Sequence, residues 1–180
     1  MVYNHIALIG LGLISSSIAL AIRRKNKNVK ITGTSRSFKT RKKAHELGLC
    51  EVSDTTVEAV KDADLVILCV PVGAMASVVQ EFATELKPGS TVTDVGSVKV
   101  EVIAKVTPFL PAEVDFIPGH PLAGTENSGP EAGFATLFDN RWCLLTPSKD
   151  CSREAIQRLR FFWEDLGARV DEMDAEHHDL

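Results

Sequence analysis

The sequence lacks the cysteine pattern of a metal-binding or disulfide-linked protein. Its four cysteines stand far apart, with no Cys-x-x-Cys pair: Cys50, Cys69, Cys143 and Cys151. This spacing argues against a zinc site and against a disulfide framework, and it predicts free thiols in a reducing cytoplasm.

The chain also lacks a long uninterrupted apolar run. Residues 6–22 come closest, but Gly10, Gly12 and three serines interrupt them, and the basic residues follow the run instead of preceding it. A signal peptide has the opposite order of charge, and a membrane span needs about 20 consecutive apolar residues. We therefore predict a soluble, cytoplasmic protein with no membrane partner.

Positive charge is in deficit, with a formal net charge of -4 at pH 7. Because there is no basic footprint, nucleic acid is not an expected partner. The charge is uneven, since residues 23–43 are rich in Lys and Arg. This stretch is either a local anion site or a solvated helix face. The composition, 44% hydrophobic and 24% charged over 180 residues, is typical of one globular domain.

Short apolar runs alternate with segments of helical period along most of the chain. Strands are predicted at residues 5–9, 29–34, 65–70, 91–94, 114–117, 142–146 and 168–171. Helices are predicted at residues 15–24, 40–47, 74–86, 99–106 and 153–166. This alternation predicts an α/β fold with a doubly wound, mostly parallel sheet of Rossmann type. The exception is residues 118–140, which we interpret as a long functional loop.

A glycine loop follows the first predicted strand and opens the first predicted helix. It reads Gly10-Leu11-Gly12-Leu13-Ile14-Ser15. In such a loop one glycine permits the tight turn, and a second lets the backbone approach a pyrophosphate at the helix N-terminus. The third position is Ser15 instead of the usual glycine or alanine. A glycine turn that binds nothing is the alternative, but the strand–turn–helix context favours a dinucleotide site. We assign Val70 and Pro71, at the end of a later strand, to the same site.

The end of the second predicted strand bears on which dinucleotide binds. An NAD site needs an Asp or Glu about 20 residues after the glycines, and no acidic residue occurs between Gly10 and Arg41. Arg36 can pair with the 2′-phosphate of NADP, and three hydroxyl side chains can donate hydrogen bonds to it: Ser35, Ser37 and Thr40. We predict that NADP is preferred and NAD possible. The alternative is that Arg36 is a surface residue and that NAD serves equally well.

Two polar loops follow later strands, at residues 94–99 and 118–126. Ligands of open α/β sheets collect beyond the carboxyl ends of the strands, so both loops are expected near the nicotinamide. His120 is a candidate general base, because a neutral imidazole can take a proton from a substrate hydroxyl. On its own, a loop histidine is more often structural.

The chain resembles the prephenate/arogenate (cyclohexadienyl) dehydrogenases of tyrosine biosynthesis. The matching motifs are Gly10-Leu11-Gly12-Leu13-Ile14 with Ser17, residues 93–99 (TDVGSVK), residues 119–126 (GHPLAGTE) with Ser128-Gly129, Leu137-Phe138, and Leu145-Thr146-Pro147. The resemblance implies an oxidative decarboxylation of prephenate or arogenate, with hydride passing to NAD(P). It implies His120 as catalytic base and Ser97 as the serine that orients it.

The same resemblance bears on further residues. Thr125 and Glu126 would line the substrate mouth, and Lys99 is either a site residue or a solvent-facing lysine at a helix start. The run His177-His178-Asp179 looks like metal ligands, but the family has such residues at the start of the next helix, so no metal is predicted.

Two departures from the family stand out. Ser15 and Ser16 occupy positions where the family often has two glycines. The family also continues past Leu180 into a helical domain that forms a homodimer, closes the site and supplies basic residues for the substrate carboxylates. We therefore predict a nucleotide-binding domain at residues 1–171, with residues 172–180 beginning the connection to that helical domain. Only Arg141 and Arg153 follow His120 as evident carboxylate partners.

Two other functions remain open from the sequence. One is a stand-alone NADP-binding module that is catalytically incompetent without a second domain. The other is a dehydrogenase or reductase for a different small acid, of which the 3-hydroxyacid dehydrogenases are the nearest rivals. Those enzymes rely on a later lysine and lack the Gly-His-Pro loop.

Overall fold

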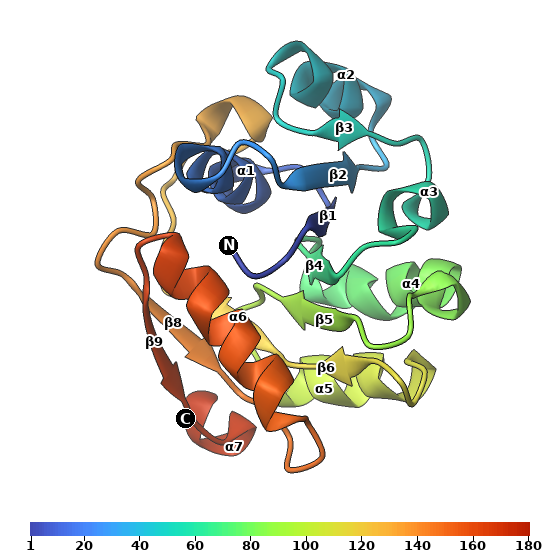
Figure 1. Ribbon diagram of the computed structural model, residues 1–180, viewed down its shortest axis with the longest axis vertical. Helices are drawn as coiled ribbons and strands as arrows, with labels where there is room; N and C mark the ends of the chain where they lie inside the picture. The colour runs from blue at the N-terminus through green and yellow to red at the C-terminus, as the bar shows by residue number, and fades with distance from the viewer.

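The computed structural model describes residues 1–180 (Figure 1). The strands are β1 (His5–Ile9), β2 (Lys30–Thr34), β3 (Glu51–Val52), β4 (Leu65–Leu68), β5 (Thr91–Asp94), β6 (Asp115–Phe116), β7 (Gly119–Pro121), β8 (Trp142–Leu145) and β9 (Arg169–Glu172). The α-helices are α1 (Leu13–Lys25), α2 (Phe38–Glu46), α3 (Thr56–Val60), α4 (Val72–Phe82), α5 (Val100–Val106), α6 (Arg153–Asp165) and α7 (Ala175–His178). Short 3-10 helices are η1 (Ala83–Glu85), η2 (Thr107–Phe109) and η3 (Pro130–Ala132). No helix is long and apolar enough to cross a membrane.

Six parallel strands form the main sheet, in the order β3-β2-β1-β4-β5-β6. Its central strands are buried on both faces, which is why they read as continuous apolar runs. Pairing of Ile9 with Thr34 and with Leu68 brings the carboxyl ends of β1, β2 and β4 level. The strand order reverses direction between β1 and β4, where ligands of such sheets bind. The predicted doubly wound α/β fold is confirmed.

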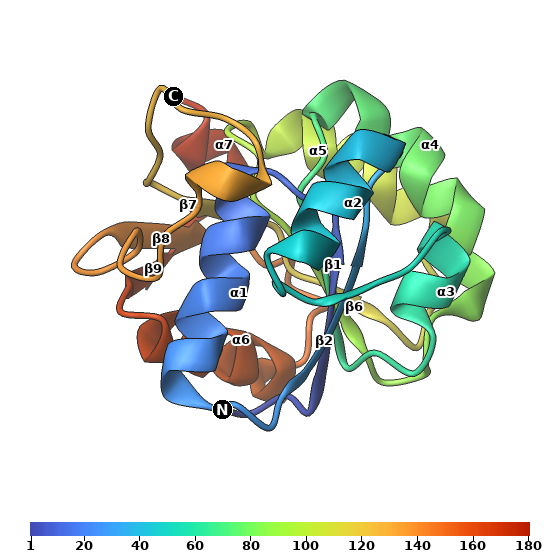
Figure 2. The ribbon, with the colours of Figure 1, turned by 90° about the horizontal axis from the view of Figure 1, so that it is seen from above.

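Helices cover both faces of this sheet (Figure 2). One core cluster lies on the side of α1 and α6 and includes Phe138, Phe162 and Trp163, whose rings pack edge to face. A second cluster lies under α3, α4 and α5, with Phe82 among its largest side chains. The two layers hold the strands rigidly, so the loops at their carboxyl ends have a fixed base.

A second sheet of three strands, in the order β7-β8-β9, corrects the prediction of one sheet. The predicted strands near residues 142–146 and 168–171 do form, as β8 and β9, but they do not extend the parallel sheet. β7 runs antiparallel to β8 and falls inside residues 118–140, which were predicted to be irregular. A Cβ on Gly119 would lie 3.1 Å from the Asp94 carbonyl oxygen, so β7 approaches β5 closely because residue 119 has no side chain.

The rest of that loop packs back onto the start of α1. A Cβ on Gly133 would lie 2.5 Å from the Cβ of Ser16, and the backbone N–H of Phe134 donates to Ser17 Oγ at 3.1 Å. Small side chains at the serine positions of α1 therefore allow this contact. Two further elements, β3 and α3, were not predicted, because runs of two and five residues are too short for a periodic signal.

Candidate active site

The glycine loop joins β1 to α1 at the point where the strand order reverses. Gly10 has φ of +100°, and a Cβ there would lie 2.5 Å from the Cys69 carbonyl oxygen, so only glycine is accommodated. Gly12 is the N-cap of α1, and a Cβ on it would meet nothing within 4 Å. That space lies at a helix N-terminus whose first turn has no acidic residue, which suits an anion.

Ser15, at the position where such loops usually have glycine or alanine, forms a side-chain hydrogen bond. Its Oγ accepts a hydrogen bond from the Gly12 N–H at 2.9 Å, which closes the first turn. The side chain is fully buried, so it does not obstruct the open side of the loop.

A groove runs along the carboxyl ends of the strands as three adjoining cavities. Val70 lines all three of them, while Gly10, Gly12 and Cys69 each line two. The cavity at the start of α1 has a volume of about 370 Å³ and is also lined by Leu13, Ile14 and Pro71. The next cavities add Ser35, Arg36 and Thr40. All predicted cofactor residues except Ser37 therefore line one groove. Ser37 is instead the N-cap of α2, where its Oγ accepts from the Thr40 N–H.

The far end of the groove carries two arginines. Arg36 is exposed and pairs with Glu81 on α4 at 3.3 Å. Arg41 lines the same cavity, and its guanidinium donates to the Ser35 carbonyl oxygen at 2.6 Å. The prediction overlooked Arg41, although it stands within the basic stretch. An acidic residue, Asp54 after β3, also lines this cavity. It stands much further along the chain than the acidic residue expected about 20 residues after the glycines, so the sequence pattern did not indicate it.

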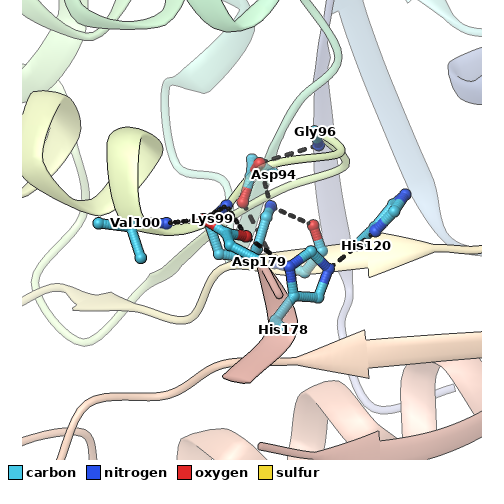
Figure 3. A network of polar contacts seen from close by, with 8 residues as sticks. Asp94, Gly96, Lys99, Val100, His120, His178 and Asp179 are labelled. Atoms are coloured by element: carbon cyan, nitrogen blue, oxygen red, sulfur yellow. Dashed lines mark hydrogen bonds and ion pairs between the residues drawn. The ribbon is translucent and has the colours of Figure 1, made fainter. Parts of the chain in front are cut away.

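A buried ion pair joins Asp94, at the end of β5, to Lys99, just before α5 (Figure 3). Lys99 Nζ donates to Asp94 Oδ2 at 2.6 Å and to the Gly119 carbonyl oxygen at 2.5 Å, and neither side chain is exposed. Asp94 also accepts hydrogen bonds from the backbone N–H groups of Gly96 and Gly119. The alternative that Lys99 faces solvent is therefore wrong. Burial raises the pKa of Asp94 and lowers that of Lys99, while their mutual attraction opposes both shifts.

His120 lies on β7, directly after one of the glycines that Asp94 holds. Its Nδ1 is 2.9 Å from Nε2 of His178 on α7, and its other ring nitrogen points away from this cluster (Figure 3). Burial lowers the pKa of His120 to about 4, with His178 and Lys99 acting in the same direction. The imidazole is therefore neutral at pH 7, as a general base requires. The correction to the prediction is that His120 stands on a strand and not in an irregular loop.

The other predicted active-site residues make no hydrogen bond to His120. Ser97 is exposed, follows Gly96 and lines the cavity at the start of α1, while the Nδ1 partner of His120 is His178 instead of Ser97. Thr125 and Glu126 are exposed beyond β7, and the Thr125 hydroxyl accepts from the Asn127 N–H. The structure thus brings Ser97 and His120 to one edge through Asp94, and it leaves Thr125 and Glu126 on the surface.

Basic residues for a substrate carboxylate are sparse around this edge. Arg153 is already paired with Glu172 at 2.9 Å, and Arg141 is exposed beside β8. All four cysteines are free thiols. No group of three or more His, Cys, Asp or Glu side chains is arranged to hold a metal ion.

The strand order, the open glycine loop and the groove define a Rossmann-type nucleotide-binding domain. Residues 18–172 match the family model of the prephenate dehydrogenase nucleotide-binding domain. The chain belongs to this family, so the resemblance read from its motifs is confirmed.

Individual relatives agree with this assignment. The chain is 45% identical over 179 residues to the cyclohexadienyl dehydrogenase of Zymomonas mobilis, covering 99% of this chain and 61% of that protein. It is 35% identical to the prephenate dehydrogenase of Bacillus subtilis, covering 98% of this chain and 48% of that protein. The chain thus spans about half to three fifths of the length of these relatives.

A solved structure shares the fold. The crystal structure of prephenate dehydrogenase from A. aeolicus in complex with hydroxyphenyl propionate and NAD+ superimposes with a TM-score of 0.89 at 31% identity. The match covers 97% of this chain and 61% of that one.

Proposed function

We propose that this chain is the cofactor-holding part of an NAD(P)-dependent dehydrogenase that oxidatively decarboxylates prephenate or arogenate. One observation carries the proposal. Asp94 accepts hydrogen bonds from the backbone N–H groups of Gly96 and Gly119, which hold Ser97 and His120 close to the end of β5, and Ser97 lines the cavity at the start of α1. Family membership and the cyclohexadienyl and prephenate dehydrogenase names of the relatives support the substrate class.

His120 is the base in the proposed reaction. A neutral imidazole accepts the proton of the ring hydroxyl as the C–H bond on the same carbon breaks. A bound nicotinamide ring would take up that hydride. The bond from the ring to its carboxylate breaks in the same conversion, carbon dioxide leaves, and its electron pair completes the aromatic ring. Ser97 would orient the hydroxyl and the histidine, and Thr125 and Glu126 would reach the substrate from the loop after β7.

The groove fits a dinucleotide, and its arginines support NADP over NAD. The open face of Gly12 and the start of α1 would hold the pyrophosphate. Arg36 and Arg41 would face a 2′-phosphate, which Arg binds through paired hydrogen bonds. Glu81 and Asp54 stand in the same cavity and limit that preference, so NAD remains a usable cofactor.

Turnover tests the proposal directly. Mixing the chain with NADP or NAD and with prephenate or arogenate, and following the absorbance of the reduced cofactor, is expected to show oxidation of one of these acids. Cofactor binding without turnover would favour the alternative of a nucleotide-binding module that lacks a second domain. Such a result would fit the shortage of free basic residues for the substrate carboxylates.

A substitution assigns the base. His120→Asn is expected to lower kcat by about 10²-fold or more, the usual range for loss of general base catalysis, with cofactor affinity unchanged. His45→Asn, on the exposed face of α2, is the matched control and should leave kcat as it is. Undiminished turnover in His120→Asn would remove His120 from the chemistry.

The family resemblance also supports a homodimer in the reducing cytoplasm, the compartment that suits four free thiols. In the family the dimer forms through the helical domain that follows, so sedimentation of a chain that carries this domain tests it. A monomer at all concentrations of that longer chain would contradict the proposed dimer.

A further inference from the structure

Three side chains stand in line behind the proposed base. Asp179 Oδ1 is 2.7 Å from His178 Nδ1, and His178 Nε2 is 2.9 Å from His120 Nδ1. The side chain of His178 is only 4% exposed, and the two imidazole rings meet edge to face, 5.1 Å between centroids. Figure 3 shows the carboxylate, the first ring and the second ring following one another, from α7 to β7.

With His178 neutral, hydrogen-bond chemistry sets the direction of every proton in this line. An ionised carboxylate can only accept, so His178 Nδ1 carries the hydrogen. A neutral imidazole has one N–H, so His178 Nε2 holds a lone pair and accepts. His120 Nδ1 must then donate. Its Nε2 is left with a free lone pair, on the side of the ring that points away from the cluster.

Asp179 is itself anchored as an anion. Its carboxylate accepts hydrogen bonds from the backbone N–H groups of Lys99 at 2.9 Å and of Val100 at 2.9 Å, at the start of α5. Burial alone raises the pKa of Asp179, but the hydrogen bonds from His178 and from these two N–H groups outweigh it and lower the pKa. The line therefore begins at a carboxylate that is charged at neutral pH.

We propose that His178 and Asp179 are positioning residues that hold His120 as its Nδ1–H tautomer, with Nε2 presented as the proton acceptor. Free histidine favours the opposite tautomer, with the hydrogen on Nε2, which would leave no lone pair at the outward nitrogen. The catalytic consequence rests on the proposed function, whereas the tautomer is a property of the folded chain alone.

Asp179 and His178 also lie next to the positive charge that His120 gains in the proposed reaction. When His120 takes a proton it becomes an imidazolium, and burial, His178 and Lys99 disfavour that charge, whereas Asp179 favours it. Asp179, acting across His178, is the anion on its side of the ring. A positioned carboxylate behind a catalytic histidine both selects its tautomer and stabilises its charged form.

Nitrogen NMR of the 15N-histidine-labelled chain reads the tautomer without any assay of activity. Long-range proton–nitrogen correlations at pH 7 are expected to show His120 and His178 both protonated at Nδ1 and unprotonated at Nε2. A His120 resonance pattern with the hydrogen on Nε2 would overturn the inference, whatever the enzyme turns over.

Variants at residue 178 separate positioning from packing. His178→Phe keeps a ring but removes the acceptor, and His120 is expected to shift to the Nε2–H tautomer. In His178→Gln the side-chain carbonyl can still accept from His120 Nδ1–H, so the original tautomer should return. His177→Phe, on the exposed side of the same helix, is the control and should change nothing. An unshifted tautomer in His178→Phe would overturn the inference.

Turnover adds the catalytic consequence. His178→Phe is expected to lower kcat by about 10-fold, less than the roughly 10²-fold or more that loss of the general base itself costs, while KM for the cofactor stays constant and His178→Gln recovers much of the rate. An equal loss in His178→Phe and His178→Gln would contradict the role of the acceptor. If wild type oxidises neither prephenate nor arogenate, the proposed function fails, while the NMR spectra still decide the tautomer.

Discussion

The two ends of the groove are built in opposite ways. The cofactor end is made of open backbone and exposed charge, with a bare glycine at Gly12 and Arg36 71% exposed. The proposed catalytic end is made of buried charge, with Asp94 and Lys99 fully enclosed and His120 held by a partner 58 residues away. The exposed charges at the first end can be changed to alter its ligand preference without disturbing the fold. At the second end, binding and stability depend on the same atoms.

The largest expected effect is at the buried pair. Lys99→Met removes the cation and leaves the Asp94 carboxylate without its partner, and breaking a buried pair in this way costs about 3–5 kcal/mol of unfolding free energy. Urea denaturation measures the loss. Lys105→Met is the control, because its pair with Glu101 is exposed and is expected to cost less than about 1 kcal/mol.

A matched pair of substitutions sharpens this prediction. Asp94→Asn combined with Lys99→Met removes both charges, so it should be less destabilised than Lys99→Met alone. Equal stability of Lys99→Met and Lys105→Met would show that the catalytic end is no more dependent on buried charge than the surface is.

The next effect is at the glycine loop. Gly10→Ala forces an L side chain into φ of +100° and against the Cys69 carbonyl, which should cost about 1–3 kcal/mol and weaken cofactor binding by about 10-fold or more. Gly73→Ala near the start of α4 meets nothing within 4 Å and should be neutral or slightly stabilising. Calorimetric titration with NADP and NAD checks both variants, and normal binding by Gly10→Ala would contradict the tight turn.

A smaller effect concerns pH. The pKa of His120 is about 4 in the folded chain, against an ordinary value of 6.5, so the unfolded chain binds more protons between these values. Stability therefore rises with pH across this window and is lost as pH falls from about 6.5 towards 4. His5, whose pKa burial also lowers, adds in the same direction.

Unfolding in urea at pH 7 and pH 5 tests this expectation. His120→Asn should reduce the difference between the two pH values and leave the part that comes from His5. His177→Asn, at an exposed position, should keep the full difference. A pH response in His120→Asn that equals wild type would show that His120 is not the group that resists protonation.

The smallest effect is at the arginines. Glu81→Gln frees Arg36 from an exposed ion pair, which is worth less than about 1 kcal/mol, or up to roughly fivefold in affinity. The Kd for NADP is expected to fall by this factor while the Kd for NAD stays constant. Glu113→Gln, at an exposed position far from the groove residues in sequence, is the control for a general loss of negative charge. A parallel change in both affinities would mean that Arg36 does not distinguish the cofactors.

The sequence predicted the structure best where an element depends only on neighbouring residues. Five-residue apolar strands and the Gly10–Gly12 loop lie within one βα unit, so their spacing alone indicates a dinucleotide fold. The sequence predicted β7 less well, because a three-residue strand that contains glycine and proline has the composition of a loop. The separate three-stranded sheet could not be read either, since strand pairing depends on contacts between distant segments.

The sequence by itself determined the fold class, the glycine turn, the family and the identity of the candidate base. These follow from periodicity, backbone freedom and motif order, which a chain displays along its length. Only the tertiary structure decided that Lys99 is buried against Asp94, that Arg41 joins Arg36, and that Asp179 and His178 stand behind His120. Those arrangements depend on burial of charged groups and on hydrogen bonds between side chains. Both arise only when segments far apart in the chain pack together.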